Sequence, residues 1–252
     1  MPRRARAPSP AGHAPAYRLA LFDRDFLLGP AMRGARLQIE YTKAEEALKA
    51  AGIRSTIVVF GGSRVAEDGP GRHAAWYAAA RDFGRIASER GGARHPRRGV
   101  RENVIATGGG PGIMEAACRG AHEAGAPAIG FNIRLPEEQQ PNRYTTPALT
   151  FQFHYFAIRK LHLAMRARAL VVFPGGFGTL DELFEILTLR QAGRFRAVPI
   201  VLVDEAHWRA VIRWEALVEH GLVAAGDLAL LRFADDAEGA WAALAAAGLG
   251  AA

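Results

Sequence analysis

The chain has 252 residues, of which 50% are hydrophobic, with a formal net charge of +7 and one cysteine, Cys118. A chain of this length and composition can bury a full hydrophobic core, a lone cysteine excludes an internal disulfide, and the lack of an 18-residue apolar run excludes a transmembrane helix. We therefore expect a cytoplasmic globular protein with no membrane partner.

The first sixteen residues differ in composition from the rest. Residues 1–16 are rich in proline, alanine and arginine and contain no apolar stretch, which predicts a disordered basic tail rather than a signal peptide. A single domain is expected over residues 17–252. Three of the positive charges, Arg3, Arg4 and Arg6, lie in the tail. The remaining chain has no basic stripe interleaved with aromatic residues, and segment 94–101 is interpreted as a solvated loop, so no nucleic-acid partner is expected.

The rest of the chain alternates between apolar runs and helical patterns. A helix over 31–51 is expected to pack across the sheet or its edge. Strands are predicted at 56–60, 103–107, 127–133, 169–173 and 198–203, with a weaker run at 228–233, and helices at 72–90, 111–124, 155–168, 178–193, 205–220 and 236–247. This alternation predicts a doubly wound, Rossmann-like α/β fold, with a mainly parallel sheet and helices on both faces. The long proline-containing loop 134–150 predicts a lid or an interface segment.

Three of the predicted strands end in glycine-rich loops. In chain order these loops carry Gly62 and Ser63, then Gly108, Gly109 and Gly110 with Glu115 beyond them, and finally Gly175, Gly176 and Gly178. The ends of parallel strands lie along one edge of a sheet, and a helix that begins there presents free N–H groups to an anion. Each loop alone could be a tight turn and nothing more. Together the three predict one anion-binding crevice.

The third loop is followed by a helix with acidic side chains in its first two turns: Asp181, Glu182 and Glu185. On spacing alone, Thr179 and Glu182 form a capping box, in which each side chain bonds the other residue's N–H, and this structural role is the commoner one. The second glycine loop shifts the balance toward chemistry on a phosphorylated sugar. Whether Glu182 is a cap or a catalyst stays open at this point.

The predicted helix 155–168 begins with basic residues directly ahead of the third glycine loop. Arg159 and Lys160 start this helix, and the planar fork of an arginine suits ribose, phosphate or a catalytic carboxylate. His154 and His162 are interpreted as structural, since no His/Cys/carboxylate spacing predicts a metal site. Cys118 lies on an apolar helix face and is expected to pack inertly.

The nine residues Pro174-Gly-Gly-Phe-Gly-Thr-Leu-Asp-Glu182, with Arg159-Lys160 ahead of them and Gly108-Gly-Gly-Pro-Gly112 earlier, resemble the LONELY GUY family. These proteins are cytokinin riboside 5′-monophosphate phosphoribohydrolases, often labelled lysine decarboxylases. The resemblance runs from about residue 56 to residue 204. Asn132 and the segments 136–139 and 153–156 are closer to the longer bacterial branch, which also resembles nucleotide 5′-monophosphate nucleosidases.

The resemblance implies hydrolysis of the N-glycosidic bond of a nucleoside 5′-monophosphate, of the AMP or N6-prenyl-AMP type, without a cofactor. Glu182, ionised, would stabilise the oxocarbenium-like ribosyl centre, and Arg159 would orient the substrate and lower the pKa of Glu182. Lys160 and Thr188 would be further substrate contacts, and Glu137 or Glu138 would stand for an acidic contact of the family. Family members are dimers or larger assemblies. The substrate's phosphate would bind the residues of the third loop, Gly175, Gly176, Gly178 and Thr179.

The residues speak against two other enzyme classes and leave one binding class in competition. A pyridoxal-phosphate decarboxylase needs a Schiff-base lysine, and the chain offers only Lys43, Lys49 and Lys160. Neither the second nor the third glycine loop has the spacing of a dinucleotide fingerprint, which argues against an NAD-dependent dehydrogenase. The competing class is a carrier or sensor of a nucleotide or of molybdenum cofactor on the same fold. Such a protein needs the anion cradle but has no evident need for the pair Glu182 and Arg159.

Overall fold

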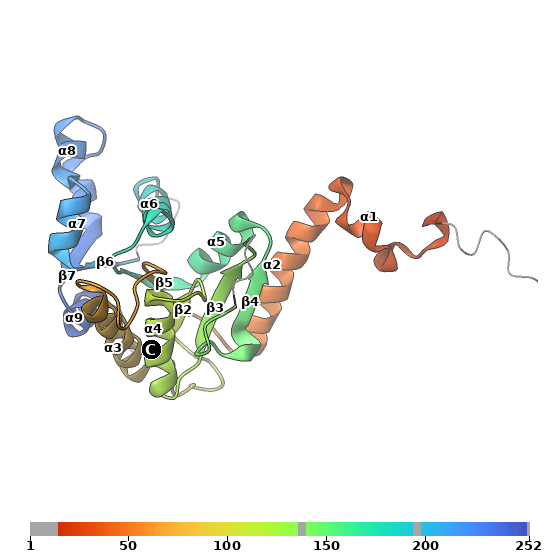
Figure 1. Ribbon diagram of the computed structural model, residues 1–252, viewed down its shortest axis with the longest axis horizontal. Coiled ribbons are helices and arrows are strands. Elements are labelled where there is room, and N and C mark those ends of the chain that lie inside the picture. Colours follow the sequence, from red (N-terminus) through yellow and green to blue (C-terminus); the bar gives the residue numbers. More distant parts are fainter. Residues whose placement is uncertain (1–14, 136–139, 194–197, 251–252) are drawn as a thin grey trace, which may run out of the picture.

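The computed structural model describes residues 15–135, 140–193 and 198–250. These residues form one sheet of seven strands, all parallel, in the order β4-β3-β2-β1-β5-β6-β7 (Figure 1). The strands are β1 (Thr56–Phe60), β2 (Val104–Thr107), β3 (Ala128–Ile133), β4 (Thr150–Phe153), β5 (Ala167–Val172), β6 (Ile200–Val203) and β7 (Leu231–Ala234).

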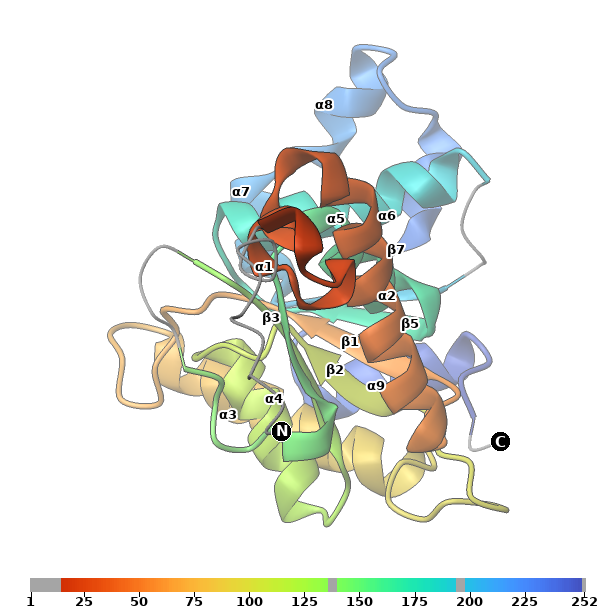
Figure 2. The same cartoon turned by 90° about the vertical axis from the view of Figure 1, so that its right-hand side faces the viewer.

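Helices cover both faces of the sheet, as predicted (Figure 2). Helices α3 (His73–Arg90), α4 (Ile113–Glu123) and α9 (Ala237–Ala246) pack on one face, and α2 (Arg33–Ala50), α5 (Phe156–Met165), α6 (Phe177–Gln191), α7 (Glu205–Val211) and α8 (Trp214–Glu219) pack on the other. Strand β1 shows why both faces are covered. Ile57 and Val59 point toward the layer of α3, α4 and α9, while Val58 and Phe60 point toward the other layer. A strand that is apolar on both sides must be covered on both sides.

The chain builds the sheet outward from its centre in two directions. The chain runs from β1 through β2 and β3 to the edge strand β4, then returns to place β5 beside β1 and continues to β7. The direction of winding therefore reverses between β1 and β5. In doubly wound sheets, ligands bind beyond the carboxyl ends of the strands at this reversal. The first and third glycine loops follow these two strands.

The structure differs from the predicted elements in three main places. Strand β4 lies between the predicted loop 134–150 and the predicted helix 155–168, and it was not predicted because four residues give too short a pattern. The helix predicted at 155–168 ends at Met165, since β5 already begins at Ala167. The helix predicted at 205–220 is two helices, because Ile212 adopts an extended conformation. Helix α2 packs at the sheet edge as expected: Glu40 accepts hydrogen bonds from the backbone N–H groups that follow β4.

The described part of the loop 134–150 supports the second glycine loop. Asn142, Thr145 and Leu149 are buried, and the backbone N–H of Asn142 donates to the Gly109 carbonyl at 2.9 Å. A short 3₁₀ turn (Pro147–Leu149) leads into β4. Glu137 and Glu138 lie outside the described residues. Hydrogen bonds thus tie the described residues that follow Pro141 to the second glycine loop and the sheet, and the expectation of a lid or an interface segment stays a prediction.

The N-terminal segment ahead of α2 forms short helical turns. They are Pro15–Tyr17, Ala20–Phe22, α1 (Arg24–Leu28) and Pro30–Met32, and a further 3₁₀ turn, Ala225–Leu230, precedes β7. Of the segment 1–16 that is predicted to be disordered, Pro15 and Ala16 lie in the first of these turns, and residues 1–14 lie outside the described part. Among the helices of the described ranges, none is both long and apolar enough to cross a membrane.

Helices α3 and α4 contact each other through glycines. A Cβ atom on Gly120 would lie 1.8 Å from the Arg81 carbonyl oxygen, so the two backbones touch directly. Helix α4 also carries Cys118, which is fully buried with its Sγ atom 3.4 Å from Thr107 Oγ1. The expectation that Cys118 packs inertly is confirmed.

We expect Gly120→Ala to lower the free energy of unfolding by about 3 kcal/mol, because the added methyl group must push α3 and α4 apart. Gly34 on α2 is the matched control, since an added Cβ there meets nothing within 4 Å. Gly34→Ala should raise the free energy of unfolding by up to about 1 kcal/mol through the higher helix propensity of alanine. Denaturant titration measures both changes, and similar values for the two variants would refute the close contact.

Candidate active site

The three glycine loops meet at the carboxyl ends of β2, β1 and β5. The N–H of Gly62 donates to the Pro174 carbonyl at 2.9 Å, and the N–H of Ile113 donates to the Gly62 carbonyl at 3.2 Å. Beside them lies a crevice of about 660 Å³, a volume typical of small-molecule sites. The predicted convergence of the loops is confirmed. The lining includes Gly62, Ser63, Arg64, Gly108, Gly110, Met114, Asn132, Ile133, Leu135, Arg159, Gly176, Phe177, Gly178, Thr179, Leu180 and Glu182.

The third loop places a helix N-terminus in this crevice. Helix α6 begins at Phe177, and its first intrahelical bond is donated by the N–H of Leu180 to the Gly176 carbonyl. The N–H groups of residues 177–179 precede that bond and are available to an anion. A Cβ atom on Gly176 or Gly178 would meet nothing within 4 Å, so these two glycines leave open space over the N–H groups. Gly175 instead packs closely, since a Cβ there would lie 2.2 Å from Thr179 Oγ1.

The capping-box interpretation of Thr179 and Glu182 is wrong. The N-cap residue of α6 is Gly176, and no side chain caps the helix. Thr179 lies inside the first turn, so Glu182 stands beyond the position from which it could reach back to an N-cap. Its Oε1 atom accepts a hydrogen bond from Arg159 Nη1 at 3.1 Å instead. The carboxylate of Glu182 is therefore free of a helix-capping role.

The second loop is held in place by two buried amides. Asn132, at the end of β3, donates from Nδ2 to the Gly109 carbonyl at 3.1 Å, and Asn142 donates from Nδ2 to the Gly110 carbonyl at 3.0 Å. Gly109 has a φ of +70°, and a Cβ there would lie 2.1 Å from Asn132 Oδ1. Only glycine fits both that conformation and that contact.

Arg159 connects three parts of the site. Its Nε donates to the Phe131 carbonyl at 2.7 Å, and its Nη1 contacts Glu182. A Cβ atom on Gly108 would lie only 2.3 Å from its Nη2, so the guanidinium packs directly against the second loop. The guanidinium is thus fixed between β3, the second loop and α6, with only 9% of the residue exposed. An arginine held by a carbonyl and a carboxylate keeps one face for a ligand in the crevice.

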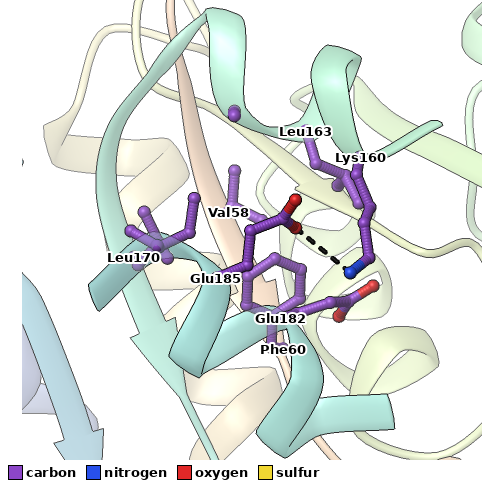
Figure 3. Close-up of a pocket in the computed structure, with 9 residues that line it drawn as sticks. Val58, Phe60, Lys160, Leu163, Leu170, Glu182 and Glu185 are labelled. Atoms are coloured by element: carbon purple, nitrogen blue, oxygen red, sulfur yellow. Dashed lines mark ion pairs between the residues drawn. The ribbon is translucent and has the colours of Figure 1, made fainter. Parts of the chain in front are cut away.

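The side chain of Glu182 is 13% exposed and packs against apolar side chains. A small cavity of about 10 Å³ behind it is lined by Val58, Phe60 and Leu170 among others, and Figure 3 shows Glu182 and Glu185 extending from α6 toward Lys160 on α5. Burial raises the pKa of Glu182 to about 7, although the positive charges of Arg159 and Lys160 lower it. Arg159 lowers the pKa of Glu182 as expected, but desolvation outweighs this attraction, so the expectation that Arg159 keeps Glu182 ionised holds only above about pH 7.

Three predicted contacts, Lys160, Asp181 and Thr188, are not part of the crevice lining. Lys160 Nζ forms ion pairs with Asp181 at 2.7 Å and with Glu185 at 3.2 Å. Burial lowers the pKa of Lys160, but these two carboxylates outweigh burial and raise it. Thr188 donates from Oγ1 to the Phe184 carbonyl at 2.7 Å. Lys160, Asp181 and Thr188 share an open groove of about 420 Å³ that is lined by α5 and α6.

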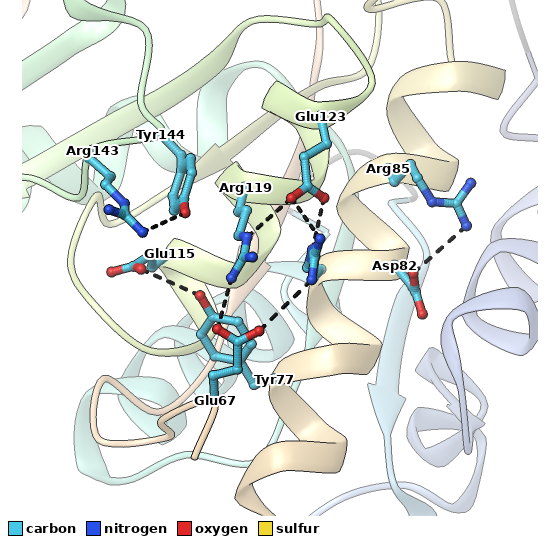
Figure 4. A network of polar contacts seen from close by, with 10 residues as sticks. Glu67, Tyr77, Asp82, Arg85, Glu115, Arg119, Glu123, Arg143 and Tyr144 are labelled. Atoms are coloured by element: carbon cyan, nitrogen blue, oxygen red, sulfur yellow. Dashed lines mark hydrogen bonds and ion pairs between the residues drawn. The ribbon is translucent and has the colours of Figure 1, made fainter. Parts of the chain in front are cut away.

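Glu115 is also placed outside the crevice lining. Its Oε1 atom accepts a hydrogen bond of 3.4 Å from the Tyr77 hydroxyl, within a network between α3 and α4 (Figure 4). In the same network Arg119 contacts Glu67 at 2.8 Å. Glu67 lies in the loop that carries Gly62 and Ser63, so this network holds the first loop rather than a ligand.

Sequence reasoning assigned no site role to several lining residues. Arg64 directly follows the first loop, and Phe177 lies between two motif glycines with 92% of its surface exposed. Both positions could have been read from the motifs themselves. Met114, Ile133 and Leu135 add apolar walls, and these could be found only once the loops were known to converge.

The comparisons with known proteins agree with this geometry. The family model described as "possible lysine decarboxylase" matches residues 114–244, slightly more than half of the chain. The probable cytokinin riboside 5′-monophosphate phosphoribohydrolase LOG4 of Oryza sativa subsp. japonica is 29% identical over 185 residues, covering 72% of this chain and 73% of the rice protein. The Arabidopsis thaliana phosphoribohydrolase LOG7 is 26% identical over 129 residues, covering 49% of this chain and 57% of its own length.

Two solved structures share the fold. The X-ray structure of TM1055 has a TM-score of 0.52 and 20% identity over 75% of this chain and 96% of its own. The molybdenum cofactor binding protein of Rippkaea orientalis has a TM-score of 0.51 and 20% identity over 77% of this chain and 97% of its own. At this identity the likeness concerns the fold alone. With the family model covering more than half of the chain, the protein belongs to the "possible lysine decarboxylase" family, that of the LONELY GUY phosphoribohydrolases.

Proposed function

We propose that this protein hydrolyses the N-glycosidic bond of a nucleoside 5′-monophosphate, of the AMP or N6-prenyl-AMP type, to a free base and ribose 5-phosphate. The observation that carries the proposal is the buried pair Arg159–Glu182 beside an open helix N-terminus in one crevice. An anion cradle alone suits a carrier as well as an enzyme. A carboxyl group with a raised pKa next to that cradle suits chemistry.

Each part of the crevice has a role in this reaction. The N–H groups of residues 177–179, with the helix dipole, suit the 5′-phosphate, and the open space at Gly176 and Gly178 lets it approach the backbone. The ribose would then extend toward Glu182 and Arg159. The apolar walls from Met114 and Leu135 suit a base. Ionised Glu182 would stabilise the positive charge that develops at C1′.

The chemical step requires one water molecule. The C1′–N bond breaks with its electron pair leaving on the base nitrogen, and the water oxygen attacks C1′. Glu182 would accept a proton from that water, and the departing base gains one, so the water supplies a hydroxyl to the sugar and a proton to the base overall. A pKa of about 7 suits this task, because the carboxylate is both present and basic near neutral pH.

A lysine decarboxylase activity is disfavoured by the residues themselves. A Schiff-base lysine must react as a neutral amine. Lys160 is ion-paired with two carboxylates that raise its pKa, while Lys43 and Lys49 lie on α2 at the edge of the sheet. None of the three lysines faces the glycine loops of the crevice lining.

Chromatography of the free base released from AMP, N6-prenyl-AMP, GMP, IMP, CMP and UMP tests the proposal. We expect release from at least one 5′-monophosphate and none from adenosine, because the nucleoside lacks the phosphate that the N-terminus of α6 would hold. Binding of these nucleotides without release from any of them would overturn the enzyme and favour a carrier or a sensor.

A further inference from the structure

A second hollow lies at the opposite edge of the sheet from the crevice. It has a volume of about 360 Å³ and is lined by Arg54, Arg90, His95, Arg97 and Arg98, together with Glu89 and Glu102. Arg54 precedes β1, whereas Gly61 and Gly62 follow it, so β1 separates the two sites. Five residues of strand correspond to about 16 Å. A ligand in one site therefore does not touch the other.

The acidic side chains of this hollow already have hydrogen-bond partners within the protein. Glu102 is bonded by Arg54 and by the Ser55 hydroxyl, and Glu89 accepts a hydrogen bond from Arg85 Nη1 at 3.1 Å. Arg90 in turn forms two hydrogen bonds of 2.8 Å with Glu238, outside the hollow.

Three basic side chains remain for a ligand. Within residues 15–135, 140–193 and 198–250, the side chains of His95, Arg97 and Arg98 form no hydrogen bond or ion pair. Four arginines and two glutamates give the lining a formal charge of +2. The hollow therefore combines positive charge with arginine forks that have no partner in the described chain.

Hydrogen bonds fix the conformation of the loop that carries these side chains. Arg97 and Val100 exchange backbone hydrogen bonds of 2.9 and 3.0 Å across a tight hairpin. Arg101 donates from Nη1 to the Ala93 carbonyl at 2.6 Å and anchors the loop behind it. Arg98 has a φ of +51°, a left-handed conformation that glycine or asparagine would adopt at lower cost. Residues held in such conformations cluster at ligand-binding positions.

We propose that this hollow binds a small anion with two or more linked phosphate groups. Arginine forks bind phosphate oxygens in pairs, and Arg97 and Arg98 are adjacent on one hairpin, which suits neighbouring charges. The volume is that of a small-molecule site. Glu89 and Glu238 interrupt the basic surface, which disfavours an extended nucleic-acid strand. The same chemistry describes an inorganic polyphosphate and the phosphate chain of a nucleoside triphosphate.

Titration calorimetry of the full chain with inorganic tripolyphosphate and with ATP tests this site. We expect the double variant Arg97→Ala, Arg98→Gly to weaken tripolyphosphate binding about tenfold or more, because two charge-assisted contacts are lost. The glycine relieves the left-handed strain at position 98, so the variant should fold, and thermal unfolding checks this. A preference for ATP over tripolyphosphate that is lost in the double variant would identify a nucleotide as the ligand of the hollow, and equal affinity would identify the phosphate chain.

Two control variants separate binding in this hollow from attraction by net charge and from binding in the crevice. Arg213→Ala removes an exposed arginine elsewhere and should leave binding unchanged, which controls for net charge. Arg64→Ala alters the crevice lining, so a loss in this variant would report binding in the crevice rather than in the hollow. Unweakened binding in the double variant, an equal loss in either control, or binding of a single-stranded oligonucleotide but not of tripolyphosphate would overturn the proposal. Base release is a separate measurement, so failure of the proposed enzyme function would not be confused with failure here.

Discussion

Glu182→Gln is expected to reduce base release by about 10³-fold while ribose 5-phosphate still binds, because the amide neither accepts a proton nor stabilises a cation as a carboxylate does. Glutamine can still accept the hydrogen bond from Arg159, so the geometry of the crevice should survive. Single-turnover measurements by chromatography, with calorimetry of ribose 5-phosphate, report the two properties separately. Retained turnover would remove Glu182 from the chemistry.

Glu185→Gln is the matched control for this variant. Glu185 lies on the same helix, pairs with Lys160 and is outside the crevice lining. Its variant should keep base release within a few-fold of the wild-type rate. A loss as large as that of Glu182→Gln would indicate that charge on α6 matters rather than the specific carboxylate at position 182.

The same Glu182→Gln variant should be more stable than the wild type above pH 7. The folded protein holds the pKa of Glu182 at about 7, against an ordinary value of 4.5, so the folded state binds more protons between these values. The contribution of the group to stability is full below pH 4.5 and is lost as the pH rises through 7. This difference corresponds to at most roughly 3 kcal/mol. Denaturant unfolding at pH 5 and pH 8 should show the variant gaining much more on the wild type at pH 8 than at pH 5.

Arg159→Met is expected to lower base release at pH 7 by about 10²-fold and to move the pH profile upward. The wild-type profile of kcat/KM should rise with pH through an inflection near 7, as Glu182 ionises. Without the guanidinium, burial acts with less opposition, so the pKa of Glu182 rises and the inflection moves to higher pH. The variant also leaves the Phe131 carbonyl without its 2.7 Å hydrogen bond, which weakens positioning.

The control for this prediction is Arg166→Met. Arg166 ends the same helix and pairs with Glu45 at 2.8 Å, outside the crevice lining. Its loss should reduce stability without moving the inflection. Arg159→Lys keeps the charge but not the fork, and so should hold the inflection closer to 7 while still lowering kcat. An unmoved inflection in Arg159→Met would contradict the electrostatic coupling between Arg159 and Glu182.

The central sheet and the meeting of the three loops were predictable from the sequence. Strands that are apolar on both sides, such as β1, allow few arrangements, and parallel strands bring their following glycines to one edge. Strand β4 was missed because Thr150–Phe153 is too short for a clear apolar run, although its two phenylalanines are buried. Asn142 was missed because it lies in a proline-containing loop whose return to Gly110 depends on tertiary contacts.

The electrostatics of the site could not be predicted in the same way. Sequence places Arg159 and Glu182 near each other, and an ion pair alone would lower the pKa of the carboxyl group. The opposite sign follows from apolar side chains on β1 and β5, such as Phe60 and Leu170, which surround Glu182 only in the folded sheet. Likewise, the start of α6 depends on Gly176, whose extended backbone takes the N-cap position ahead of Thr179.

Cys118, buried between α4 and β2, is a natural probe for the separation of α4 from the sheet. Burial raises the pKa of this thiol to about 11, so only about one molecule in ten thousand carries a thiolate at pH 7, and no solvent reaches the sulfur. A thiol-reactive dye should therefore label the protein only when α4 separates from the sheet. Because the chain contains no other cysteine, the labelling rate in native buffer measures how often that layer opens, without any engineered reporter.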